Sequence, residues 1–225
     1  MTPFVLNEDD EAIITSVLEK NVSPNEKWAD PAVTELKARM KRHYIEQQEY
    51  CCAYCKVHKP SLHGGDWDLE HIMHKNNFDK WMFHPENLCV SCKECNGYKG
   101  TSLITKSPTY NKFPTRSSNY TIVHAHYDRY EDHITALVPG ITYRYKGDKY
   151  GKGWKTIEVC GLLRYHEEGG RTQVDPIIQA VLRLAADDQR QENLQLAIEM
   201  LQGKINALSS VSYTHLRAHE TVLDL

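Results

Sequence analysis

Two Cys-x-x-Cys pairs are the residues of this chain whose types and spacing most clearly indicate chemistry. Cys52 and Cys55 form the first pair, and Cys92 and Cys95 form the second. Two such pairs, separated by a few tens of residues, can place four thiolates around one tetrahedral ion. We therefore predict a structural zinc site at these four cysteines.

Other potential ligands close to these pairs leave the zinc ligand set open. Cys89 has the same x-x spacing to Cys92, and His58 follows the first pair closely. We prefer Cys92 with Cys95 because Cys89 lies in a predicted strand, where a buried free cysteine packs as a small hydrophobe. An exchange of one ligand for Cys89 or His58 is the alternative.

The residues between the two pairs, together with the residue that follows the second pair, include the polar side chains that a hydrolytic site needs. They are two carboxylates (Asp68 and Glu70), an imidazole (His71) and two amides (Asn87 and Asn96). Alternate side chains of a strand share a face, so Asp68 and Glu70 are expected to point together. His71 joins them only if the strand ends and twists there.

The order Asp-x-Glu-His-Ile, then Asn-Leu, then Cys-x-x-Cys-Asn-x-x-Lys-Gly resembles the HNH endonuclease family over residues 52–100. The resemblance implies a ββα-metal finger with one catalytic divalent ion. It also implies individual roles: a general base (His71), ligands of the ion (Glu70 and Asn96, with Asp68), a residue that holds the loop orienting the base (Asn87) and a phosphate contact (Lys99). Oxygen ligands favour a hard cation, so the expected ion is Mg²⁺ or Mn²⁺.

A second resemblance lies beyond the finger. Lys112-Phe-Pro114 and the segment 122–134 are similar to a bacterial HNH subgroup found in anti-phage systems of the Septu and retron-linked kind. This resemblance implies DNA as substrate and an ATPase subunit as a partner. The same segment holds metal-ligand types close together, namely His124, His126, Asp128, Asp132 and His133. We expect hydrogen-bonded packing there, with a second metal as the alternative.

The composition of the chain agrees with a globular protein of the cytoplasm. Of 225 residues, 40% are hydrophobic and 25% are charged, and no apolar run is long enough for a membrane span. Seven cysteines, six of them clustered, suit zinc in a reducing compartment better than disulfides. The net charge of −3 argues against bulk coating of nucleic acid, yet residues 90–155 contain eleven Lys and Arg against five Asp and Glu. That segment can line a phosphate groove, or it can be a solvated surface.

The predicted fold class is α+β, in four segments. We expect an N-terminal helical segment over 1–50, an HNH nuclease domain over 51–135, a β-hairpin and C-terminal helical region over 136–209, and a non-native tail over 210–225. Expected helices are 13–18, 31–44, 93–100 and a segment after Asp175, and expected strands are 67–71, 87–90, 120–126, 141–146 and 154–159. The glycine-rich segment 147–153 is expected to be the hairpin loop, and the polar segment 72–85 is expected to lie outside the core, held down by Trp81, Met82 and Phe83.

The function predicted from these patterns is metal-dependent cleavage of DNA by an HNH endonuclease, as the effector of an anti-phage defence system. The alternative is a non-catalytic zinc-ribbon module that binds nucleic acid or a protein partner. A further alternative is an effector subunit that stays idle until an ATPase partner engages it.

Overall fold

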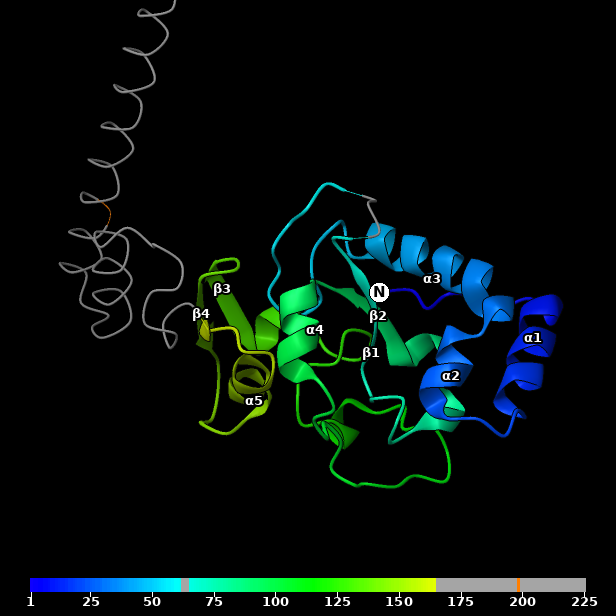
Figure 1. Cartoon of the computed structure of the whole chain (residues 1–225). Helices are drawn as coiled ribbons and strands as arrows, with labels where there is room; N and C mark the ends of the chain where they lie inside the picture. Colours follow the sequence, from blue (N-terminus) through cyan, green and yellow to red (C-terminus); the bar gives the residue numbers. More distant parts are fainter. Residues whose placement is uncertain (62–64, 165–197, 199–225) are drawn as a thin grey trace, which may run out of the picture. The chain divides into compact units, whose positions relative to one another are not determined.

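The structure is a computed structural model that describes residues 1–61, 65–164 and 198 (Figure 1). The chain divides into two units, and the first of them is Met1–Glu167. The helix expected after Asp175 and the tail 210–225 lie outside the described residues. The predicted segment boundaries near residues 50, 135 and 209 stay predictions.

The first unit begins with helices whose ends are set by side-chain caps. Reciprocal capping boxes start α1 (Glu8–Leu18) and α2 (Pro24–Ala29). Asp30 then caps the short 3-10 helix η1 (Pro31–Val33), and α3 (Thr34–Gln47) follows it directly. The predicted helix at 31–44 is thus confirmed, although Asp30 and Pro31 start the 3-10 helix η1 and α3 begins only at Thr34. One face of α3 enters the core, through Leu36, Met40, Tyr44 and Ile45.

A strand, a second strand and a short helix form the centre of the unit. β1 (Asp68–His71) pairs antiparallel with β2 (Leu88–Ser91), with Glu70 opposite Cys89. After one residue α4 begins (Lys93–Lys99), and it ends at Gly100, whose φ of +48° favours glycine. Both strands contact α3, and β1 also contacts α4. All three elements were predicted within one or two residues.

The chain between β1 and β2 corrects one expectation, because it contributes to the core. It contains η2 (Asp79–Trp81) and η3 (Pro85–Asn87), and its apolar side chains are buried. Ile72, Met73 and Phe78 join the main core, while Met82 and Phe83 form a second cluster with Val17 and Val33. Asn76, Asn77, Asp79 and Lys80 are exposed between these anchors, whereas Asn87 is fully buried.

The region after residue 100 departs most from the prediction. Residues 120–126 form no strand: after η4 (Ser117–Asn119) only Tyr120 makes a bridge, to Thr105. The hairpin consists of β3 (Ile134–Val138) and β4 (Thr142–Tyr145), preceded by η5 (Tyr130–Asp132). Its turn contains Gly140 at φ +86°, so the predicted hairpin loop at 147–153 is wrong.

The predicted strand at 154–159 is also wrong, because this segment is the helix α5 (Lys152–Val159). Gly153, Thr156 and Ile157 are buried at helical spacing, and α5 contacts β4. A Cβ at Gly153 would lie 2.1 Å from the carbonyl oxygen of His133, so the helix start needs glycine here. The mixture of helices and two antiparallel strand pairs agrees with the predicted α+β class. No helix among the described residues is long and apolar enough to cross a bilayer.

Candidate metal centre and active site

The four predicted zinc ligands lie together. The Sγ atoms of Cys52, Cys55, Cys92 and Cys95 are all within 4.8 Å of one another, and all four residues are buried. The Sγ atoms of Cys55 and Cys92 are 3.8 Å apart. Tetrahedral Zn–S bonds of about 2.3 Å place sulfurs about 3.8 Å apart. The cluster can therefore hold a zinc ion.

Backbone and side-chain donors surround these sulfurs. The amide of Cys92 donates to Cys52 Sγ at 3.4 Å, and the amide of Cys95 donates to Cys92 Sγ at 3.5 Å. Arg164 Nη1 lies 3.8 Å from Cys95 Sγ. Hydrogen bonds from the other three cysteines, Cys52 first, lower the pKa of the Cys92 thiol, whereas contacts in the same cluster, again Cys52 first, raise the pKa of the Cys55 and Cys95 thiols. The backbone amides and Arg164 stabilise the thiolate form, which is the form that binds a metal.

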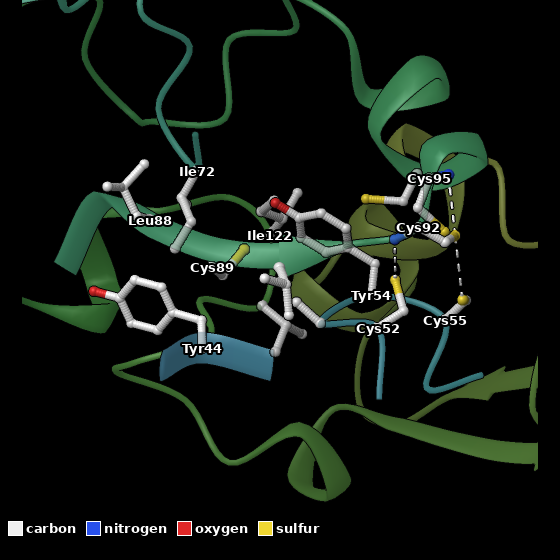
Figure 2. Packing of buried hydrophobic residues seen from close by; sticks show 14 of the residues in the cluster. Tyr44, Cys52, Tyr54, Cys55, Ile72, Leu88, Cys89, Cys92, Cys95 and Ile122 are labelled. Atoms are coloured by element: carbon white, nitrogen blue, oxygen red, sulfur yellow. Dashed lines mark hydrogen bonds between the residues drawn. The ribbon is translucent and has the colours of Figure 1, made fainter. Parts of the chain in front are cut away.

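Cys89 and His58 do not belong to this cluster, so the ligand swap considered from the sequence does not occur. Figure 2 shows the four ligands beside the start of α4, with Cys89 farther along β2 near Tyr54 and Ile122. Cys89 is fully buried and packs in the main core, as predicted. Burial raises the pKa of its thiol well above the ordinary value, as expected of a structural cysteine.

A separate cavity of about 370 Å³ brings four of the predicted active-site residues together. Asp68, Glu70, His71 and Asn96 all line it. Because β1 ends at His71, the alternation of the strand does not keep this residue away from the two carboxylates. Asn87 and Lys99 are not among the lining residues.

Lys99 instead lies beneath the cavity, in an ion pair with Glu70. Its Nζ is 2.6 Å from Glu70 Oε1, and its side chain is 0% exposed. The same Nζ donates to the carbonyl oxygen of His71 at 2.8 Å. The predicted phosphate contact of Lys99 is therefore corrected, because the ammonium is inside the protein and tied to β1. Burial raises the pKa of Glu70, and the charge of Lys99 opposes that rise.

The imidazole of His71 is held in one orientation. Its Nε2 lies 3.1 Å from the carbonyl oxygen of Met82, which can only accept a hydrogen bond. Nε2 must therefore carry the proton, and Nδ1 then carries the lone pair in the neutral ring. The ring of Trp28 packs edge-on against it, with centroids 4.3 Å apart. Burial, together with the charges of Lys75 and Lys99, lowers the pKa of His71 well below its ordinary value.

Asn87 fixes the segment that carries Met82. Its Oδ1 accepts from the amide of Met73 at 2.7 Å, and its Nδ2 donates to the carbonyls of Met73 and Trp81, each at 3.1 Å. The residue is fully buried. This side chain thus ties together both ends of the loop that supplies the hydrogen-bond partner of His71.

Asp68 and Asn96 meet at the rim of the cavity. Asn96 Nδ2 donates to Asp68 Oδ2 at 2.9 Å, and Lys93 Nζ is 3.1 Å from Asp68 Oδ1. Carboxylate and amide oxygens of Asp68, Glu70 and Asn96 are the donor types that Mg²⁺ and Mn²⁺ prefer. These residues therefore fit a hard divalent ion by chemistry. They are more widely spread than the cysteines, which form the metal-ligand cluster found in the described residues.

The cavity is also lined by residues that were not assigned to the site from the sequence, among them Trp28, Lys37, Lys41, His74 and Lys75. Burial lowers the pKa of each of the three lysines. Lys37 and Lys41 lie four residues apart on α3, and this spacing is the sequence signal that places both on one face of the helix. Trp28 lies 43 positions before His71, so no local pattern connects the two.

The segment rich in histidine after residue 122 is packed by hydrogen bonds. Asp128 Oδ2 accepts from the amide of His124 at 2.7 Å, and Asp128 also pairs with Lys152. His126 Nε2 contacts the carbonyl oxygen of Leu88 at 2.8 Å. Within the described residues this group does not form a metal-ligand cluster. The packing interpretation is therefore favoured over a second metal.

Comparison with known proteins gives one distant similarity. The chain is 28% identical over 96 residues to Septu protein PtuB of Bacillus thuringiensis, and the match covers 43% of this chain and 34% of that protein. This chain thus aligns with about a third of the relative's length. No family model matches the chain, and neither does any solved structure. The chain is thus similar over part of its length to a Septu protein, and it carries a cysteine cluster that could hold a zinc ion.

Proposed function

We propose that this protein is an HNH-type endonuclease that uses a divalent metal ion to hydrolyse phosphodiester bonds in DNA. One observation carries the proposal: His71 lines the same cavity as Asp68, Glu70 and Asn96. Phosphodiester hydrolysis needs a base for the attacking water and positive charge for the phosphoryl oxygens. Both requirements can be met in this cavity.

His71 acts as the general base in this proposal. A base must be unprotonated at neutral pH, and burial keeps the pKa of this imidazole low. The contact of Nε2 with the carbonyl of Met82 leaves Nδ1 to take a proton from water. Asn87 is a positioning residue, because it fixes the loop that contains Met82.

Asp68, Glu70 and Asn96 would hold Mg²⁺ or Mn²⁺. When bound, the ion supplies charge neutralisation for the phosphate and for the leaving oxygen. Lys99 holds Glu70 in place through an ion pair to Oε1. Lys37, Lys41 and Lys75 attract the phosphate backbone in the role first expected of Lys99.

The zinc ion has a structural role in this account. The first cysteine pair precedes β1, while Cys92 caps α4 and Cys95 lies within it. A zinc ion bound by all four thiolates would join these segments and fix α4, and with it Asn96, relative to β1. The catalytic ion and the zinc ion therefore have separate ligands.

Similarity to PtuB, a Septu protein, supports a role in anti-phage defence. The ATPase subunit expected from the sequence resemblance is the proposed partner of the nuclease. The clustered thiols, none of them in a disulfide within the described residues, support a location in the reducing cytoplasm. The proposed partner rests on the sequence resemblance and not on the geometry of the cavity.

A second candidate is a non-catalytic zinc module that binds nucleic acid. The ion pair between Glu70 and Lys99 favours it, because Lys99 already neutralises a carboxylate assigned to the catalytic ion. Incubation of the purified protein with supercoiled plasmid, with Mg²⁺, with Mn²⁺ and without either, separates the two. The nuclease yields nicked or linear DNA only with a metal. If the protein retards the plasmid in a gel but leaves it intact under all three conditions, and also when an ATPase partner is supplied, the result supports the non-catalytic zinc module.

A further inference from the structure

A second cavity, of about 510 Å³, lies at the start of α5. It is lined by three lysines (Lys106, Lys152 and Lys155), two aromatic side chains at its outer end (Tyr150 and Trp154), and Ser118, Tyr120, Thr121 and Gly151. It shares no lining residue with the cavity of Glu70 and His71. Nothing assigned to cleavage above uses it.

The charges at this cavity favour an anion. Asp128 holds Lys152 at 2.5 Å but is itself buried, and Glu158 pairs with Lys155 at 2.5 Å on the outer side. Lys149 lies next to the lining residues, and Asp148 is the remaining acidic neighbour in this segment. The region belongs to the stretch 90–155, where basic residues outnumber acidic ones by eleven to five.

The start of α5 adds hydrogen-bond donors. The N-cap residue is Gly151, and no side chain caps this end of the helix. First-turn amides of an uncapped helix are ready to bind phosphate oxygens. They supplement the lysines, and the cavity does not depend on them alone.

Tyr150 is the most unusual residue at this site. Its side chain is 70% exposed, although a tyrosine of this size normally packs at least one face. Its φ of +76° is a conformation that costs a residue with a Cβ roughly 1 kcal/mol or more. Its ring meets Trp154 edge-on at 4.9 Å, and Lys149 Nζ lies over the ring, 5.4 Å from its centroid, so a base that stacks on that face takes the place of this ammonium group. A strained, exposed aromatic side chain at the edge of a basic cavity is suited to stacking on a base.

We propose that this cavity binds a strand of single-stranded nucleic acid, with a base stacked on Tyr150 and phosphates held by Lys106 and Lys155. Stacking platforms combined with lysines are the general means by which proteins hold unpaired strands. The inference deepens the proposed function, since it assumes that nucleic acid is the substrate, and it adds a binding site away from the scissile bond.

The test measures the binding of a fluorescein-labelled oligothymidylate by fluorescence anisotropy. The probe has about 20 nucleotides, a length that exceeds the usual site size of such surfaces. All proteins carry His71→Ala and are measured without added Mg²⁺ or Mn²⁺, so that the probe stays intact. Tyr150→Gly removes the ring while relieving the strained backbone, so the variant retains its fold. We expect it to bind at least fivefold more weakly, from the loss of one stacked base.

Matched variants define the chemistry. Tyr150→Phe keeps the aromatic face and should bind within twofold of its parent. Lys155→Ala should reduce the slope of log affinity against log salt by about 0.7, as for one phosphate contact to a single strand. Lys112→Ala, an exposed lysine that does not line the cavity, should leave the slope unchanged.

Three results would overturn the inference: equal affinity of Tyr150→Gly and its parent, a duplex bound as tightly as the single strand through Tyr150, or thymidine monophosphate bound as tightly as the oligonucleotide. Cleavage assays judge the proposed function separately. A protein that cuts plasmid but binds oligonucleotide independently of Tyr150 refutes only this inference. A protein that never cuts but binds through Tyr150 refutes only the nuclease.

Discussion

The buried side chains of Glu70 and Lys99 form an ion pair of 2.6 Å directly beneath the candidate active site. Lys99 Nζ also donates to the carbonyl of His71, so a single ammonium group binds both residues at the end of β1. The lysine expected to bind substrate from outside instead supports the site from within. This arrangement links the stability of the fold to the geometry of the site.

Removing one partner of this pair is expected to be costly. Lys99→Met leaves the carboxylate of Glu70 buried without its counter-ion, and such changes cost about 3–5 kcal/mol in the free energy of unfolding. The double variant Glu70→Gln with Lys99→Met should recover part of this loss, because no unpaired charge remains. Urea denaturation of the three proteins measures the difference. Equal stability of Lys99→Met and the parent would contradict the buried ion pair.

Zinc binding should depend on the four clustered cysteines and not on Cys89. Cys95→Ser is expected to lower the zinc content well below one equivalent and to destabilise the fold, because zinc binding and folding are coupled. Cys89→Ala creates only a small cavity in the core and should retain a full equivalent. Elemental analysis of the purified proteins gives the zinc content. Loss of zinc from Cys89→Ala, but not from Cys95→Ser, would reverse the ligand assignment.

Asn87 should matter for both the fold and the site. Asn87→Ala leaves the amide of Met73 and the carbonyls of Met73 and Trp81 buried without this partner, at a cost of roughly 2–4 kcal/mol. Asn76, in the same loop, is exposed, and its side chain makes no hydrogen bond that the described residues show. Asn76→Ala should therefore change the stability by less than about 0.5 kcal/mol. Thermal or urea unfolding that ranks the two variants in the opposite order would exclude the positioning role.

The stability of the protein should fall as the pH falls below about 6.5, in part through His124. Burial lowers the pKa of His124 well below its ordinary value; His126 and Lys152 add to the shift, and Asp128 opposes it. The folded state keeps this ring neutral, whereas the unfolded chain binds a proton near pH 6.5. One such group removes up to about 1.4 kcal/mol per pH unit below that value.

The comparison of His124→Asn with its parent isolates this contribution, since loss of zinc at low pH affects both proteins alike. The variant should show a smaller difference in unfolding free energy between pH 7.5 and pH 5.5. An unchanged difference would mean that His124 titrates normally in the folded protein.

Local patterns were enough to predict the centre of the fold. The spacing of the cysteines defines two tight turns, and β1, β2 and α4 each follow from a short run of suitable residues between glycines and cysteines. Asp68, Glu70, His71 and Asn96 lie within 29 positions of one another, so their common cavity follows once these elements are placed.

Tertiary packing decided the remainder. Thr156, Ile157 and Val159 are β-branched and favour a strand, yet the contact of Gly153 with His133 and the packing on β4 make this segment a helix. Whether Lys99 faces solvent or the core depends on Glu70, which comes from a different element. Trp28 reaches His71 from a segment to which the sequence assigned no chemistry.

The most direct test of the account is the initial rate of plasmid cleavage by His71→Ala, with Mg²⁺ or Mn²⁺ and at equal zinc content and folded fraction. Loss of a general base typically lowers the rate by about 10²–10⁴-fold. We predict a fall of that size, with DNA binding and zinc content retained. Cleavage by His71→Ala at the rate of the unmodified protein would contradict the assignment of His71 as the base, and with it the proposed active site.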